Sequence, residues 1–156
     1  DCHNNNIIHR DLKTANILFD PKTNHITVID FGLARSLENH PSQDIPSNIS
    51  SEIHTPQLIG TPIFMAPEQF LRPNQELTTA IDIWGFGITA FSMLTGKMPF
   101  EVNKLSELKH VLQYHEMQPA KSLRAELPDW LSELCHSCLS FAPEDRPSAY
   151  DLCTQF

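Results

Sequence analysis

The segment "LTTAIDIWGFGITAFSMLTG" constrains the fold of this 156-residue chain more than any other part of the sequence. Its apolar side chains would occupy every face of a helix, so that helix has to be enclosed by the rest of the chain. We predict a buried helix over about 79–95 that ends at Gly96 and is capped by Thr78 or Thr79. Asp82 lies in its first turn, where a buried carboxylate needs a charged partner or backbone donors.

The remaining regular structure is predicted to be one β-hairpin and several helices. The runs "NILFD" and "HITVID" are rich in strand-forming residues and flank the turn signal "PKTN". The stretches "LSELKHVLQYH", "DWLSELCHSCLSF" and "PSAYDLCTQF" have helical periodicity, and Ser148 and Asp151 have the spacing of a capping box. A two-stranded hairpin is not stable alone and has to pack on helices. We therefore predict an α+β, mainly α fold with a small β-hairpin beside a helical bundle around one buried central helix.

Charge and hydropathy exclude some classes of partner. The formal net charge of -8 disfavours binding to nucleic acid. No apolar run reaches the roughly 18 residues that a membrane-spanning helix needs, because Asp82 interrupts the most apolar segment. We expect no nucleic-acid partner, no membrane segment in this sequence and a cytoplasmic location.

One cysteine pair raises the question of a metal or redox site. Cys135 and Cys138 form a CxxC with His136 between them, but a zinc site needs four ligands and no second pair is visible. The pair also falls within a helical pattern, where cysteine is an ordinary small core residue. We predict two core cysteines, with a metal or redox site as the alternative.

Polar residues gather at both ends of the predicted hairpin. Asp11, Lys13 and Asn16 precede its first strand, and Asp30 follows its second. An aspartate near a lysine is favoured in its ionised form and can accept a proton from a hydroxyl, while a lysine can neutralise a phosphoryl oxygen. Asn and Asp oxygens suit a hard cation such as Mg²⁺. Since a hairpin brings its two ends together, the sequence predicts a magnesium site formed by Asn16 and Asp30 with a base beside it.

Three motifs in this order resemble those of the eukaryotic-type protein kinase family, Ser/Thr type. "HRDLKTAN" at 9–16 is similar to the catalytic loop, "DFG" at 30–32 to the metal-binding motif, and "APE" at 66–68 to the end of the activation segment, which would then span 30–68. The resemblance covers all of 1–156 and implies the C-terminal lobe of a protein kinase domain.

The resemblance implies ATP and Mg²⁺ as cofactors and a role for each polar residue. Asp11 is similar to the catalytic base that orients and deprotonates the substrate hydroxyl, and Lys13 to the residue that contacts the γ-phosphoryl group. Lys13 within "DLKTAN" is also typical of Ser/Thr kinases rather than tyrosine kinases. Asn16 and Asp30 correspond to the magnesium ligands, and Leu18 to the residue that lies under the adenine ring.

Other positions resemble the structural framework of the family. His9 and Phe31 correspond to two members of a hydrophobic stack, and Asp82 to the residue that holds the backbone of the catalytic loop. Glu68 and Arg146 are expected to form an ion pair, although without the resemblance they would be interpreted as unrelated surface charges.

Apolar periodicity disappears from Leu33 to Ile59, and the segment 36–57, rich in Ser, Asn and Pro, is predicted to be a long mobile loop that bears on regulation. An Arg before the catalytic Asp, here Arg10, implies pairing with a phosphate in the activation segment. Thr61 corresponds to a threonine that bonds the catalytic Asp and lines the substrate-docking loop. Many relatives carry the phosphorylated hydroxyl three residues before the glycine of the "GT" pair, where this sequence has Gln57. Thr55 is the best candidate for the phosphate, and a solvated loop without a regulatory phosphate is the alternative.

The function that the resemblance implies is transfer of the γ-phosphoryl group of ATP to a Ser/Thr hydroxyl of a protein substrate. Neither the glycine-rich loop nor the strand lysine of the N-terminal lobe is found in this sequence. The glycines of "GFG" at 85–87 cannot form that loop, because they lie in the predicted buried helix. We therefore expect that this polypeptide needs the N-terminal lobe of its own chain, is inactive alone, and exposes apolar residues such as Leu18 and Phe31. The alternatives are a pseudokinase that acts as a binding scaffold and a natural truncated product that competes for substrate.

Overall fold

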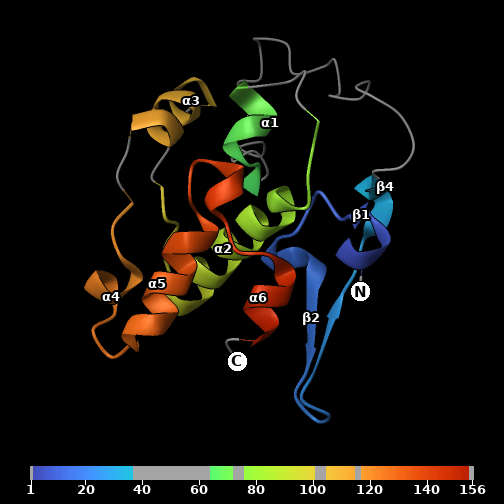
Figure 1. Ribbon diagram of the computed structural model, residues 1–156. Coiled ribbons are helices and arrows are strands. Elements are labelled where there is room, and N and C mark those ends of the chain that lie inside the picture. The colour runs from blue at the N-terminus through green and yellow to red at the C-terminus, as the bar shows by residue number, and fades with distance from the viewer. Residues whose placement is uncertain (1, 37–63, 72–75, 101–104, 115–116, 155–156) are drawn as a thin grey trace.

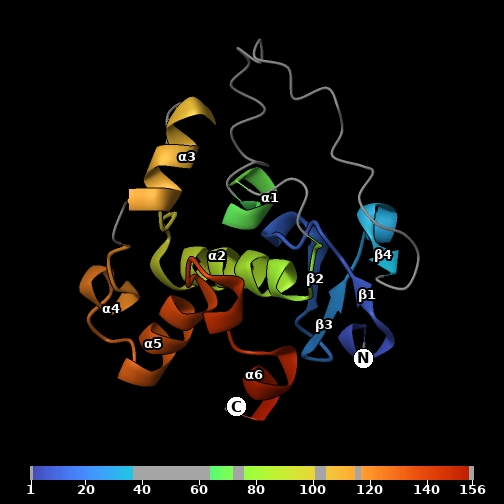
Figure 2. The same cartoon turned by 45° about the horizontal axis from the view of Figure 1, so that its top comes forward.

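The computed structural model describes residues 2–36, 64–71, 76–100, 105–114 and 117–154. The predicted central helix is present as α2 (Ala80–Thr95). In Figures 1 and 2 it crosses the middle of the molecule, with α5 (Asp129–Cys138) packed along it and the β-strands beyond its N-terminal end. The architecture is mainly helical with small antiparallel sheets, as predicted.

Helix α2 is buried on nearly all sides, which explains its uniformly apolar sequence. Trp84, Ile88 and Phe91 are at most 1% exposed. Gly96 ends the helix with φ +70°, a conformation that costs glycine little. At the start, Thr79 is the N-cap residue but makes no side-chain cap bond, because its backbone is already helical. The hydroxyl of Thr78 instead accepts a long bond of 3.4 Å from the backbone N–H of Ala80.

The predicted hairpin consists of β2 (Ile17–Asp20) and β3 (His25–Val28). At its turn, Asp20 accepts hydrogen bonds from the Thr23 hydroxyl and the Lys22 backbone, and these bonds lower the pKa of Asp20. At its open end, the backbone N–H of Ile29 donates to the Asn16 carbonyl at 2.9 Å. The two segments that carry Asn16 and Asp30 are therefore bonded together, as the sequence predicts.

A second antiparallel pair was not predicted. Strand β1 (Ile7–Ile8) pairs with β4 (Arg35–Ser36), so the prediction of a loop over 36–57 is wrong at Ser36. The remainder of that segment lies outside the described residues. A strand of two residues is too short to show an alternating pattern in the sequence. Its pairing depends on tertiary structure, because the β2–β3 hairpin between β1 and β4 brings the two strands together. A short 3-10 turn, η3 (Phe31–Leu33), precedes β4.

The other helices surround α2. The three predicted stretches form α3 (Leu105–Tyr114), α5 and α6 (Ala149–Thr154). The capping box of α6 is present, because the Ser148 backbone donates to Asp151 at 2.9 Å and the Asp151 backbone donates to the Ser148 hydroxyl at 3.2 Å. Short elements that were not predicted are α1 (Pro67–Leu71), α4 (Ala120–Leu123), η1 (His3–Asn5), η2 (Thr14–Asn16) and η6 (Pro143–Asp145).

Cys135 and Cys138 are core residues of α5, and both are fully buried. Burial raises the pKa of the Cys135 thiol to about 11 and that of the Cys138 thiol to about 12. Thiols with such values stay protonated at neutral pH. Within the described ranges, no group of His, Cys, Asp or Glu side chains is arranged to hold a metal ion. In the same ranges, no helix is long and apolar enough to cross a bilayer.

Candidate active site

Two side chains of the 9–16 loop converge on the carboxylate of a third, Asp11. The Lys13 ammonium lies 2.7 Å from Asp11 Oδ2, and the Asn16 side-chain amide donates to the same oxygen at 3.1 Å. The Asn16 amide also donates to the Asp11 backbone carbonyl at 2.8 Å, which closes the loop on itself. Asp11 Oδ2 thus has two donors, which hold the carboxylate in one orientation. In the sequence these residues are only near neighbours, whereas in the structure Lys13 and Asn16 both contact the same oxygen, Asp11 Oδ2.

The ring of His9 connects this carboxylate to the hairpin. Its Nε2 lies 3.0 Å from the Ile29 carbonyl, and its Nδ1 lies 3.3 Å from the backbone N–H of Asp11. Since a carbonyl only accepts and a backbone N–H only donates, the ring carries its proton on Nε2 and is neutral. The edge of the ring packs on Phe31, with ring centroids 4.7 Å apart. His9 therefore sets the spacing between Asp11 and the segment that contains Asp30.

Asp82 holds the backbone of the loop from inside the core. Its carboxylate is 6% exposed and accepts from the backbone N–H groups of His9 and Arg10, each at 2.8 Å. Arg10 has φ +70°, a strained value for a residue with a Cβ. The two bonds stabilise this conformation, and the N-terminal end of the α2 dipole favours the negative charge of Asp82. A residue of the central helix thus fixes the backbone immediately before Asp11.

The proposed magnesium ligands lie at the open end of the hairpin. Asp30 is exposed and has φ +64°, and one of its carboxylate oxygens accepts from the Gly32 backbone at 3.3 Å. The carboxylate of Asp30 and the amide oxygen of Asn16 are hard donors, so this pair fits Mg²⁺ in chemistry. Leu18, predicted to lie under the adenine ring, is 53% exposed on β2.

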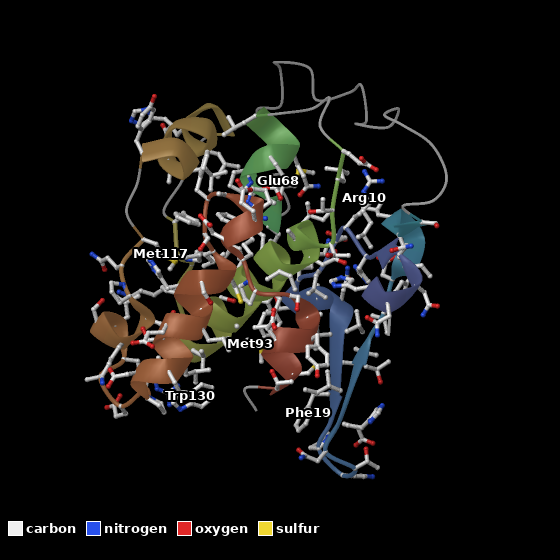
Figure 3. The ribbon with its side chains drawn as sticks, in the orientation of Figure 1. Arg10, Phe19, Glu68, Met93, Met117 and Trp130 are labelled. Carbon is white, nitrogen blue, oxygen red and sulfur yellow. The ribbon has the colours of Figure 1, made fainter. Side chains whose placement is uncertain are left out.

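Glu68 and Arg146 join the start of α1 to the segment before α6. Two hydrogen bonds of 2.7 and 2.8 Å connect the carboxylate to the guanidinium, whose side chain is 0% exposed. The remaining N–H groups of Arg146 donate to backbone carbonyls, and the guanidinium lies 5.0 Å from the centre of the Trp84 ring. The donors of the guanidinium are therefore satisfied, as a buried charge requires. Figure 3 shows Glu68 and Arg10 on the same upper side of the molecule.

Two predicted site residues cannot be placed, and two residues that contact the site were not predicted. Thr55 and Thr61 lie outside the described residues. Sequence reasoning missed His3, whose Nε2 lies 2.9 Å from Asp82 Oδ2, because nothing in "DCHNNN" marks one histidine for a distant partner. It also missed Gly85, where an added Cβ would lie 2.8 Å from the Leu12 carbonyl oxygen. A glycine inside a buried helix usually has a packing reason, and that signal could have pointed to this contact.

Known proteins resemble this chain over its whole length. The family described as "Protein kinase domain" matches residues 1–156. Serine/threonine-protein kinase Nek4 of Mus musculus is 35% identical over 98% of this chain, and PkaA of Streptomyces coelicolor is 33% identical over 96%. Serine/threonine-protein kinase sid1 of Schizosaccharomyces pombe is 34% identical over 96%. The chain spans only 17%, 25% and 28% of the lengths of these three relatives.

A solved structure agrees in fold. The structure "Titin kinase and its flanking domains" matches with a TM-score of 0.76, over 98% of this chain and 26% of that one. The identity of 21% makes this a statement about fold alone. Taken with the family match over all 156 residues, it shows that this chain belongs to the protein kinase domain family.

Proposed function

We propose that this chain is the C-terminal lobe of a Ser/Thr protein kinase that transfers the γ-phosphoryl group of ATP to a Ser or Thr hydroxyl of a protein. The observation that carries the proposal is the shared Asp11 oxygen, which Lys13 and Asn16 both contact. A structural cluster would not need an ammonium, an amide and a carboxylate in a loop whose backbone is strained at Arg10.

The side chains of the loop divide the chemical work. Asp11 accepts a hydrogen bond from the substrate hydroxyl and takes its proton as the new bond to phosphorus forms. Lys13, at 2.7 Å from Asp11, is near enough to stabilise charge on the transferred phosphoryl group. Asn16 and Asp30 would hold Mg²⁺, which neutralises phosphate charge when bound. His9 and Asp82 keep the loop in place and contact neither ATP nor the protein substrate.

The same proposal makes the chain part of a longer protein, called the parent protein below. Its curated relatives are several times longer than the matched region, with coverage between 17% and 28%. Phosphoryl transfer also requires contacts to the adenine and to the α- and β-phosphates, and no element described here supplies them beyond Leu18. We therefore propose that the N-terminal lobe of the parent protein forms the other wall of the nucleotide site.

The test is a phosphoryl-transfer assay on the parent protein with radiolabelled ATP and a Ser/Thr protein substrate. Asp11→Asn removes the proton acceptor and keeps the shape, so kcat should fall by about 10²–10⁴-fold. Asp129→Asn is the matched control, since Asp129 is an exposed aspartate on α5 that pairs only with Lys121 among the described residues. Equal activity of Asp11→Asn and the unmutated protein would refute the role of Asp11. An inactive unmutated parent that still binds nucleotide would favour the binding scaffold.

A further inference from the structure

We infer that Gln69 is a positioning residue for the segment through which the protein substrate docks, an inference that rests on the proposed function. Gln69 is the third residue of α1 and directly follows the "APE" motif at 66–68. Its side-chain oxygen accepts a hydrogen bond of 2.8 Å from the backbone N–H of Ala66. A side chain of the helix thus holds the backbone of the residue that leads into the helix.

Two hydrogen bonds join Ala66 and Gln69 in opposite directions. The Gln69 backbone N–H donates to the Ala66 carbonyl at 3.0 Å, and the Ala66 backbone N–H donates back to the Gln69 side chain. Because a backbone N–H only donates, the atom that faces it must be the amide oxygen of Gln69. Between the two residues, Pro67 is fully buried, and its ring fixes φ at the first position of the helix. The pair therefore fixes the direction in which the chain enters α1.

Gln69 holds a part of the chain that the neighbouring ion pair does not hold. Glu68 bonds Arg146 through its side chain and joins the start of α1 to the segment before α6. Gln69 instead bonds the backbone of Ala66, which is 0% exposed. Without this acceptor the buried N–H of Ala66 would be unsatisfied, which is costly, so the backbone at Ala66 would have to move.

The chain before Ala66 is the part that the proposed function assigns to the protein substrate. Phe64 packs against the hydrophobic core, and Thr61, three positions earlier, is predicted to line the substrate-docking loop. Figure 3 shows Glu68 of α1 on the same upper side of the molecule as Arg10, the neighbour of the proposed proton acceptor. A shift at Ala66 should therefore weaken docking of the protein substrate and leave the groups that bind ATP in place.

The alternative is that Gln69 caps α1 and contributes to stability alone. Helix α6 provides a matched case, because Asp151 accepts the backbone N–H of Ser148 at 2.9 Å from the same third position of its helix. A capping role predicts that Gln69→Leu and Asp151→Leu both lower stability and leave the kinetics unchanged. A positioning role predicts a kinetic effect for Gln69→Leu alone.

The experiment measures steady-state kinetics of the parent protein with ATP and dephosphorylated casein, at a temperature where every variant is folded. Leucine has no acceptor, so Gln69→Leu should raise KM for casein about 5-fold, which equals about 1 kcal/mol, with KM for ATP changed less than about twofold. Glutamate keeps an oxygen at the same reach, so Gln69→Glu should stay within about twofold of the unmutated protein. The control Asp151→Leu should leave both KM values unchanged. Should Gln69→Leu fail to fold, Gln69→Ala takes its place, because alanine also lacks an acceptor and has the highest helix propensity.

A second readout does not depend on phosphoryl transfer. In Gln69→Leu, amide hydrogen exchange at Ala66 should become about 10-fold faster relative to exchange at Ile88, which lies in the core of α2 and reports global unfolding. If the unmutated parent is inactive, the proposed function fails, and exchange at Ala66 alone decides whether Gln69 positions this segment.

Three results would overturn the inference. The first is an equal rise of exchange at Ala66 and Ile88, which indicates a loss of global stability. The second is a KM for casein that Gln69→Leu leaves unchanged or that rises no more than KM for ATP. The third is a Gln69→Glu variant that is as impaired as Gln69→Leu, because the effect would then not follow the acceptor.

Discussion

At the scale of single residues, the site depends on charged groups that the core satisfies completely. Arg146 is the clearest case, because its guanidinium is 0% exposed and bonds both oxygens of Glu68 as well as backbone carbonyls. Its plane also lies over Trp84 at 5.0 Å. Lysine could reproduce neither the paired bonds nor the stacking, so this position specifies arginine and not simply positive charge.

Removing one partner of this pair should be costly. Glu68→Gln leaves the Arg146 charge buried and incompletely paired, so the free energy of unfolding should fall by about 3–5 kcal/mol. Urea denaturation of the parent protein measures this loss of unfolding free energy. Asp129→Asn is the control, because Asp129 and Lys121 form an exposed pair, 76% and 41% exposed, and loss of such a pair costs about 0–1 kcal/mol. Similar losses in the two variants would mean that burial does not determine the energy of the Glu68 pair.

At the scale of elements, α2 is in direct contact with the 9–16 loop. Asp82 bonds the loop backbone, and one turn later Gly85 leaves room for the Leu12 carbonyl. Gly87, two positions further along the same helix, instead lies against Cys138 and Leu139. The two glycines therefore allow close approach to different neighbours.

Because the two glycines contact different neighbours, alanine variants at Gly85 and Gly87 should distinguish effects on stability from effects on activity. A Cβ at Gly85 would lie 2.8 Å from the Leu12 carbonyl oxygen, and a Cβ at Gly87 would lie 2.9 Å from Cys138 and Leu139 atoms. Overpacking of this kind costs about 1–3 kcal/mol, and the better helix propensity of alanine offsets about 1 kcal/mol of it. Both Gly85→Ala and Gly87→Ala should lower the melting temperature of the parent protein, but only Gly85→Ala should also lower kcat at a temperature where both are folded. A Gly87→Ala variant that loses as much kcat would contradict the separation.

The elements that could be predicted are those with a periodic pattern. The central helix, the hairpin and the capping box of α6 follow from hydrophobic spacing, turn residues and side-chain caps, which are local properties. The pairing of β1 with β4 and the short helices α1 and α4 depend on tertiary contacts of a few residues. In the candidate site, motifs predicted that Asp11, Lys13 and Asn16 belong to one loop, but not that His9 joins Asp11 to Ile29 or that His3 contacts Asp82.

At the scale of the whole molecule, the hairpin side carries unpartnered apolar surface. Phe19 and Ile26 lie opposite each other on one face and are 57% and 62% exposed. Figure 3 shows Phe19 in the lower half of the view, where Met93 and Trp130 also lie. Next to the hairpin, a cavity of about 560 Å³ has an almost entirely apolar lining that includes Val28 and Leu152. Surface of this kind is typical of an interface, and we expect the rest of the parent protein to cover it.

Phe19→Lys should therefore have opposite effects in two contexts. In the 156-residue polypeptide alone it removes exposed apolar surface, so binding of the dye 1-anilinonaphthalene-8-sulfonate and aggregation should decrease. In the parent protein it places a charge in a covered interface, and the free energy of unfolding should fall by about 1.5–3 kcal/mol, as expected for one buried aromatic side chain. Glu133→Lys, at an exposed position of α5, is the control and should change neither. Unchanged stability of the parent with Phe19→Lys would show that this face stays in solvent.

The attachment of the 9–16 loop to α2 also has a genetic consequence, if the proposed function holds. Asp82 and Gly85 belong to the same helix as the fully buried Trp84 and Phe91, so a small displacement of that helix moves the loop with it. Substitutions in the apolar positions of α2 should then give conditional alleles, active in the cold and inactive in the heat at temperatures where the protein is still folded and abundant. A screen for temperature-sensitive loss of function would enrich for this helix, which lies in the core of the molecule.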